Sequence, residues 1–137
     1  MIARRIRKLL RLLPPLVLAC AACAGEYSSS DQLRRTGTNY NDDVLWGRYF
    51  SASELVATEV RETWLRQHRE WREDLRIAEY EVVDSSLESD VARVLVHVTW
   101  YRMSESILQT TTLHQRWERR GRAWMLASED VESGVPL

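Results

Sequence analysis

Hydrophobic and polar residues alternate most regularly between Val91 and Trp117, and the elements expected elsewhere are arranged around this stretch. Strict alternation is typical of strands that bury one face only. It predicts two antiparallel strands, Val91–Arg102 and Ile107–Trp117, joined by a loop over residues 103–106. The length of this loop sets the register of the pair, and the register decides which side chains share a face.

The register predicts two unequal faces. The expected pairs are Arg102 with Ile107, Trp100 with Gln109, Val98 with Thr111, Val96 with Leu113, Val94 with Gln115 and Ala92 with Trp117. The face that should be buried carries Ala92, Val94, Val96, Val98, Trp100, Leu113 and Trp117. The opposite face carries His97 and His114. It also sets Arg93 against Arg116, an unfavourable pair that a bulge would separate.

Helical spacing precedes the hairpin. A helix is expected at about Asp42–Phe50, started by the capping residues Asn41-Asp42-Asp43 and weakened by Gly47. A second is expected at Thr58–Asp74. Its apolar stripe consists of Val60, Trp64, His68, Trp71 and Leu75.

Two more strands flank the hairpin in the predicted sheet. Arg76–Asp84 comes before it and Ala123–Asp130 after it, the latter placing Trp124 opposite Trp117 and Leu126 opposite Gln115. The fold class is therefore α+β. N-terminal helices should pack on the concave face of a curved, mostly antiparallel sheet of about four strands.

The N-terminus has the form of a secretory signal: Met1–Arg11 is basic and Leu12–Ala22 is a short apolar stretch. Its last part, Val17-Leu18-Ala19-Cys20, resembles a bacterial lipobox. The resemblance implies that Cys20 is acylated and anchors the protein to membrane lipid. Ala21, following that cysteine, implies sorting to the outer membrane, with the protein facing the periplasm.

Several alternatives stay open at this end of the chain. Cys23 could carry the acyl group, or a plain signal peptide could be cut near Ala24. The apolar stretch could also remain as a membrane helix, and the anchor could lie in the inner membrane. The expected organisation is a signal peptide at 1–19, a lipidated N-terminus and flexible tether at 20–40, and one domain at 41–137.

Charge and cysteine content narrow the function classes. Beyond residue 19 the chain has 14 basic and 20 acidic residues, which argues against a nucleic-acid partner. Both cysteines belong to the leader region, so the expected domain has no disulfide, no thiol nucleophile and no cysteine-bound metal. No phosphate loop, nucleophile elbow or metal-ligand spacing occurs, and no cofactor is expected.

The pattern Gln115-x-Trp117 followed by Gly121-x-x-Trp124-x-Leu126 resembles the cystatin-like α+β cone of the nuclear transport factor 2-like superfamily. The resemblance covers roughly Asp42–Val131. This superfamily includes ketosteroid isomerase, scytalone dehydratase, polyketide-cyclase-like enzymes and many non-catalytic binding domains. It implies the fold but not the activity, because function depends on the site.

His68 is the most suggestive single residue, because it interrupts an apolar helix face with a group that titrates near neutral pH. It is interpreted either as a cavity acid or base or as a core histidine with one hydrogen bond. Polar residues on the buried sheet face could line a small pocket or bond to helix ends. The candidate pocket residues are Tyr49, Trp64, His68, Gln109 and Gln115. His97 and His114 would form a metal site only with a further ligand.

These features favour a non-catalytic, envelope-anchored domain that binds a small apolar ligand or a protein partner. The alternative is a small cofactor-free isomerase or dehydratase, with His68 as base and Tyr49 or Gln115 as hydrogen-bond donor. A homodimer is a further hypothesis. The exposed row that would mediate it consists of Leu95, Tyr101, Leu108 and Met125.

Overall fold

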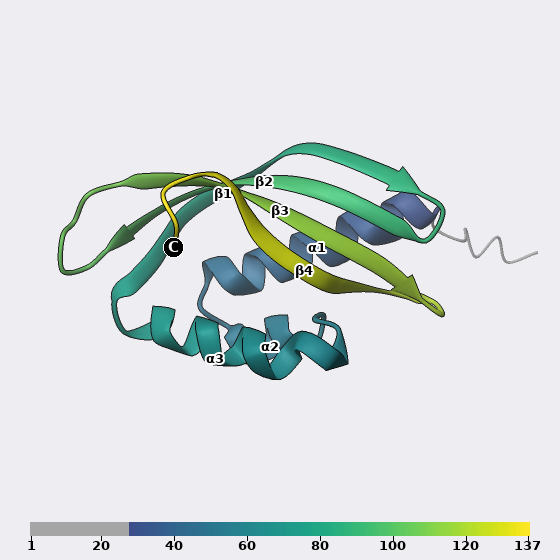
Figure 1. Ribbon diagram of the computed structural model, residues 1–137, viewed down its shortest axis with the longest axis horizontal. Coiled ribbons are helices and arrows are strands. Elements are labelled where there is room, and N and C mark those ends of the chain that lie inside the picture. The colour runs from purple at the N-terminus through teal and green to yellow at the C-terminus, as the bar shows by residue number, and fades with distance from the viewer. Residues whose placement is uncertain (1–27) are drawn as a thin grey trace, which may run out of the picture.

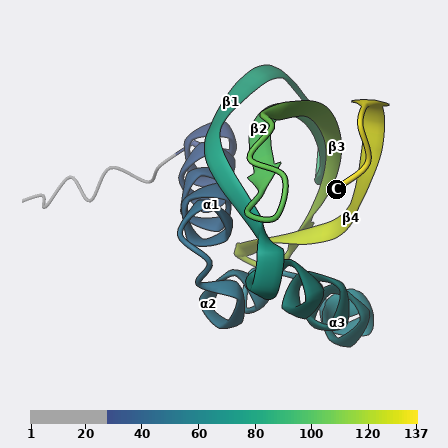
Figure 2. The ribbon, with the colours of Figure 1, turned by 90° about the vertical axis from the view of Figure 1, so that its left-hand side faces the viewer.

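The computed structural model describes residues 28–137, in which helices come first and one four-stranded antiparallel sheet follows. The elements are α1 (Ser29–Leu45), α2 (Tyr49–Ser53), α3 (Thr58–Asp74), β1 (Leu75–Glu88), β2 (Val91–Arg102), β3 (Gln109–Arg120) and β4 (Ala123–Gly134). The strands arch over the helices (Figure 1), and seen from the end the sheet curls into an open cone, with α1 beside β1 and with α2 and α3 along its lower edge (Figure 2). The predicted α+β class is confirmed.

Some predictions concern residues outside the described part. The signal peptide at 1–19, the candidate anchor Cys20 and its alternative Cys23 all lie there. Within residues 28–137, no helix combines the length and apolar character needed to cross a membrane.

The central hairpin has the predicted register. Trp100 pairs with Gln109 and Ala92 with Trp117, and the pairs between them follow in step. The predicted apolar face is buried throughout. Arg93 remains opposite Arg116, because no bulge interrupts this pair of strands. The guanidinium of Arg116 contacts the carboxylate of Glu118 instead.

The predicted hairpin loop is too short. β3 begins at Gln109, so Ile107 stays in the loop with 58% of its surface exposed. Asp74 holds this loop from the end of α3: its backbone carbonyl accepts from the Met103 amide at 2.8 Å, and its carboxylate accepts from the Ser104 amide at 2.9 Å and from the Ser104 hydroxyl at 2.8 Å. The loop is therefore held by hydrogen bonds to the end of α3, and the pairing of β2 with β3 ends at Trp100 and Gln109.

The predicted pairing of the last strand is wrong. Trp117 lies opposite Leu126, and Gln115 lies opposite Glu129. The register shifts between Arg116 and Trp117, where β4 contributes the additional residue Ala127. A bulge of this kind reverses the inward and outward order of the side chains that follow it, here as far as the second shift between Thr112 and Leu113.

The polar segment expected to be a flexible tether is helical from Ser29 onward. Ser28 begins α1, because its hydroxyl accepts a hydrogen bond from the Asp31 amide at 3.2 Å. Leu33 and Tyr40 face the core from this helix. The residues expected to cap a helix start at 41–43 instead lie in its last turns.

The helix predicted over Asp42–Phe50 is interrupted at Gly47. Leu45 ends α1, Gly47 takes a φ of +67°, and α2 starts at Tyr49. The Gly47 amide donates to Val44 at 3.1 Å and the Arg48 amide donates to Asp43 at 2.7 Å. This pair of bonds is the Schellman arrangement, in which a glycine closes a helix.

The core fills the space between the helices and the sheet. Its largest fully buried apolar side chains are Trp117, Trp124, Tyr40, Leu75 and Leu126. The segment between α2 and α3 is tied to β4, since Leu126 accepts from the Ala57 amide and donates to the Leu55 carbonyl, each at 2.8 Å. Helix α3 is thereby held against the sheet, with the stripe that carries His68 directed inward.

Candidate functional site

Polar side chains gather on the concave side of the cone, although their surroundings are mostly apolar. Asn41, His68 and Gln115 are buried, and the side chain of Glu129 is only 9% exposed. They come from α1, α3, β3 and β4. A buried polar group needs a partner to offset its lost hydration, so this cluster is the first place to look for function.

Glu129 enters this cluster because of the bulge at Ala127. Leu126 points inward opposite Trp117, Ala127 is the additional residue, and Ser128 pairs with Arg116 on the outer side. Glu129 then points inward again, beside Gln115. Without the bulge, alternation from Leu126 would direct Ser128 inward and the carboxyl of Glu129 to solvent.

Two hydrogen bonds hold the carboxyl group of Glu129. The Tyr40 hydroxyl donates to Oε1 at 3.1 Å, and the Gln115 amide donates to Oε2 at 2.8 Å. Gln115 is oriented in turn, because its Nε2 also donates to Asn41 at 2.8 Å and its Oε1 accepts from the Trp117 indole at 3.2 Å.

Burial raises the pKa of Glu129 from its ordinary value of 4.5 to about 7. The hydrogen bonds from Gln115 and Tyr40 oppose this change, while the negative charge of Asp130 adds to it. A carboxyl in this state is close to half protonated at neutral pH, which is the condition for an efficient proton donor or acceptor.

His68 faces this carboxyl. Its Nδ1 lies 2.9 Å from the carbonyl oxygen of Trp64, so we assign the ring hydrogen to Nδ1 and leave Nε2 as an acceptor. That Nε2 lies 3.9 Å from Oε1 of Glu129 and makes no hydrogen bond in the described structure. Burial lowers the pKa of His68 from 6.5 to about 4, so the imidazole is neutral at pH 7.

Aromatic rings fix the position of the imidazole. The ring of Trp64 stacks on it with centroids 3.7 Å apart, and the ring of Trp71 lies at 4.0 Å on an inclined plane. Tyr49 approaches at 5.6 Å. The Trp64 indole donates to the Tyr40 hydroxyl at 2.9 Å, so the same residues also orient the group that binds Glu129.

Each carboxyl oxygen of Glu129 accepts one hydrogen bond, Oε1 from Tyr40 and Oε2 from Gln115. Oε1 is also the oxygen that lies 3.9 Å from Nε2 of His68, so a carboxylic hydrogen on Oε1 stands beside the imidazole. At 3.9 Å the two groups do not bond directly. A donor on Glu129 and an acceptor on His68 thus lie side by side.

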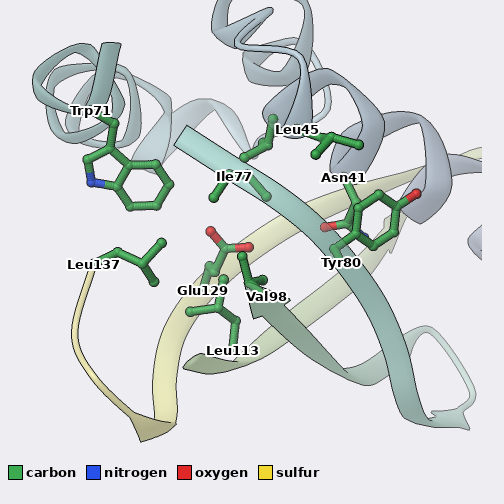
Figure 3. A pocket seen from close by; sticks show the side chains of 10 residues that line it. Asn41, Leu45, Trp71, Ile77, Tyr80, Val98, Leu113, Glu129 and Leu137 are labelled. Carbon is green, nitrogen blue, oxygen red and sulfur yellow. The ribbon is translucent and has the colours of Figure 1, made fainter. Parts of the chain in front are cut away.

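Two hollows border Glu129. The outer pocket has a volume of about 280 Å³ and is lined by Trp64, Gln67, His68, Trp71, Leu113, Glu129, Asp130, Val131 and Leu137. An inner cavity of about 20 Å³ has room for about one water molecule. Figure 3 shows the carboxyl of Glu129 in this inner cavity, among apolar side chains that include Ile77 and Leu137.

The structure brings most of the predicted pocket residues together. Trp64 and His68 line the outer pocket, and Gln115 supports Glu129 from β3. Tyr49 touches His68 but lines a different groove. Gln109 lies opposite Trp100 at the other end of β3.

Three members of the site escaped sequence reasoning. Tyr40 and Asn41 were placed in the tether and a helix cap, and Glu129 was not singled out within the last strand. The available signal for the first two was Ser28-x-x-Asp31, the pattern of a residue that starts a helix. No local signal reveals Glu129, because its orientation depends on the bulge.

The predicted metal alternative finds no support on the other sheet face. His97 lies opposite Thr112, with its Nδ1 3.2 Å from the threonine hydroxyl, and His114 lies opposite Leu95. Over residues 28–137, no group of three or more potential ligands has metal-binding geometry.

Comparison with known proteins identifies the fold. No protein-family model and no curated protein matches the chain. Among solved structures, an NTF2-like protein from Cytophaga hutchinsonii is similar, with a TM-score of 0.60 at 11% identity over 77% of this chain and 98% of that one. A ketosteroid isomerase-like protein from Erwinia carotovora atroseptica has a TM-score of 0.60 at 8% identity, over 78% and 99%.

A third similar structure belongs to an NTF2-like protein from Streptomyces avermitilis that has been suggested to be a dehydratase. Its TM-score is 0.62 at 15% identity, over 79% of this chain and 97% of that one. At these identities the likeness concerns the fold alone. The chain therefore has the cystatin-like, nuclear transport factor 2-like α+β cone, and its concave side holds a buried pair of acid–base groups.

Proposed function

We propose that the outer pocket binds a small, neutral, mainly apolar molecule that carries a hydrogen-bond acceptor close to a hydrogen-bond donor. The observation that supports this most directly is the arrangement of Glu129 and His68. Neutral Glu129 offers a hydrogen at Oε1, and His68 offers a lone pair at Nε2, 3.9 Å away. A hydroxy-ketone matches both groups at once.

The pocket supports the same class of ligand. A volume of about 280 Å³ suits a molecule of about one ring, at the small end of ligand sites. Trp64 and Trp71 offer apolar walls, and His68 is neutral at pH 7. A ligand with a full negative charge would meet the negative charge of Asp130 at the wall of the pocket, which disfavours its binding.

A second function, dehydration of the same ligand class, is favoured by the near-neutral pKa of Glu129. Nε2 of His68 would remove a proton from the carbon next to the carbonyl. Glu129 would give its proton to the leaving hydroxyl group as the carbon–oxygen bond breaks, the double bond forms and water departs. The imidazolium and carboxylate left behind form an ion pair, and passage of the proton from Nε2 to Oε1 restores the starting state.

One probe tests both functions. 3-Hydroxycyclohexanone carries the required donor and acceptor, and its dehydration product is a conjugated enone that absorbs in the ultraviolet. We expect saturable shifts in the NMR signals of the Leu113 and Val131 methyl groups. Cyclohexanone, which lacks the hydroxyl, should bind more weakly. Wild-type protein that shows no saturable shift with the hydroxy-ketone rejects the binding proposal.

Glu129→Gln separates binding from catalysis. Its amide can donate from the position of Oε1 while its carbonyl accepts from Gln115, so binding should persist within about threefold. It cannot transfer a proton, so enone formation should fall to the uncatalysed rate. Binding without enone formation in the wild-type protein rejects dehydration of this probe and leaves the binding function standing.

We also propose that Cys20 carries a lipid anchor that holds this domain at the outer membrane, facing the periplasm. The support is the lipobox-like sequence at residues 17–20. Metabolic labelling with an acyl-chain analogue should mark the wild-type chain and the Cys23→Ala variant but not Cys20→Ala. Label that is lost only in Cys23→Ala would move the anchor to that cysteine. Fractionation of the envelope would then assign the membrane.

A further inference from the structure

A second groove lies where four elements meet, away from Glu129. It occupies the junction between the end of α1, the start of α2, the end of α3 and the start of β1, with β2 closing one side. Its volume is about 380 Å³, and it is lined by Leu45, Trp46, Gly47, Tyr49, Arg72, Leu75, Arg76, Ile77 and Tyr101. Leu45 and Ile77 lie together in Figure 3, and both also border the inner cavity, so they separate this groove from the carboxyl of Glu129.

The groove is positively charged in an acidic domain. Residues 28–137 contain 14 basic and 19 acidic residues, yet the charged residues that line the groove are two arginines, Arg72 and Arg76, without a carboxylate. Arg76 is held in place, because its guanidinium donates to the backbone carbonyls of Arg72 at 3.0 Å and Leu75 at 2.8 Å. One of its nitrogens makes both bonds, so the remaining donors are available for a ligand.

Tyr49 lines the groove together with both arginines. Burial raises the pKa of Tyr49, whereas the charges of Arg76 and Arg72 lower it. Two guanidinium groups and a phenol that face one space provide donors suited to the oxygens of a carboxylate or phosphate.

Aromatic rings border the same space. Trp46 is 70% exposed, and the turn at Gly47 holds it outside the core. Tyr101, half-buried at the end of β2, lines the groove as well. An exposed tryptophan beside guanidinium groups can stack on a flat apolar body while the arginines bind its charged end.

We propose that this groove binds a small oxyanion, a carboxylate or a phosphate monoester, attached to a flat apolar body. Arg72 and Arg76 bind the anionic end, and Trp46 stacks on the body. The site is independent of the function proposed for the Glu129 pocket, which favours neutral ligands. Phenyl phosphate is a suitable probe, with inorganic phosphate as the charge-only control and phenol as the aromatic-only control.

The test is a titration of the full chain, labelled with nitrogen-15 and followed by NMR, at low and at moderate salt. Phenyl phosphate should move the Trp46 indole and Gly47 amide signals in a saturable way. It should bind more tightly than either inorganic phosphate or phenol. Added salt should weaken this binding, since exposed charges are screened. Benzoate should bind in the same place if carboxylates and phosphates are both accepted; if it does not, the site takes phosphates alone.

Variants locate the contacts. Arg72→Gln removes one charged donor and should raise the dissociation constant for phenyl phosphate about tenfold. Arg69→Gln, on the same helix but outside the groove, should leave it unchanged. Trp46→Ala should abolish the preference for phenyl phosphate over inorganic phosphate. Two results would overturn the proposal. Arg69→Gln and Arg72→Gln could weaken the binding of phenyl phosphate equally, or binding could saturate while the Trp46 and Gly47 signals do not move.

Discussion

Glu129 and His68 should give the stability of this protein two opposing pH dependences. Between its ordinary pKa of 4.5 and about 7, Glu129 keeps a proton in the folded protein that the unfolded chain releases, so its contribution to stability falls as the pH rises. Between 6.5 and about 4, the unfolded chain protonates His68 while the folded protein does not, so the His68 contribution falls as the pH falls. In the wild-type protein these two slopes nearly cancel over the range where they overlap.

Single substitutions should reveal each slope. For each group, the pKa in the folded protein differs from its ordinary value by about 2.5 units. At about 1.4 kcal/mol per unit, this difference changes the free energy of unfolding by about 3 kcal/mol over that pH range. Relative to wild type, Glu129→Gln should gain about 3 kcal/mol of unfolding free energy from pH 4.5 to 7. His68→Phe keeps the ring stack but cannot titrate. Relative to wild type it should lose about 3 kcal/mol from pH 4 to 6.5.

The measurement is urea unfolding followed by tryptophan fluorescence at half-unit steps from pH 4 to 8. The free energy of unfolding of each variant is compared with that of wild type at the same pH. The contributions of the other carboxylates are common to both proteins and cancel in this difference. The variant that combines Glu129→Gln and His68→Phe should parallel wild type from about pH 4.5 to 6.5. It lacks both pH-dependent contributions, and in wild type these two contributions cancel over that range. Glu132→Gln, an exposed change on the same strand, serves as the control. A Glu129→Gln curve parallel to wild type across the whole range would show that this carboxyl ionises normally, and the reasoning would fail.

Three further outcomes follow from single contacts. Tyr40→Phe removes a hydrogen bond that lowers the pKa of Glu129, so carbon-13 NMR of the carboxyl should show its midpoint moving above about 7. Gly134→Ala should destabilise the protein by about 2 kcal/mol or more in urea unfolding, because a Cβ there would clash with the backbone oxygen of Thr110 at a φ of +92°. Gly47→Ala, with a positive φ but open space around it, should cost about 1 kcal/mol. Thr111→Val should lower the thermal midpoint with a loss of about 1–3 kcal/mol, since its buried hydroxyl accepts from an indole at 2.8 Å and donates to a backbone carbonyl.

Alternation along the central hairpin was enough to predict its register and its buried face. Strict alternation groups Val94, Val96 and Val98 on one buried face of β2, while Val91 lies on the opposite face. The polar helix α1 was missed over most of its length, because Thr36, Gly37 and Thr38 have low helix propensity and few of its residues face the core. Tertiary packing of Leu33 and Tyr40 outweighs that propensity.

The site was predictable on the helix side and not on the strand side. His68 was identified because the spacing of α3 is regular and a polar residue on an apolar stripe is unusual. Glu129 was not, because the acidic run Glu129–Asp130 has the composition of a solvated strand end. A bulge depends on the fit between two strands across the sheet, so it leaves no mark within one strand's sequence.

The bulge at Ala127 means that the buried carboxyl is specified by how β4 pairs with β3 as much as by residue identity. Deleting Ala127 would remove the bulge and still leave Glu129 opposite Gln115, whereas a regular strand that kept Ala127 would turn Glu129 outward and bring Ser128 toward His68. Loss of the bulge without loss of a residue is therefore enough to convert an ionisable pocket into a neutral one on the same scaffold. Alignments of proteins with this fold should accordingly be compared by which side chain faces Gln115, because a conserved acidic column and a conserved pocket acid need not coincide.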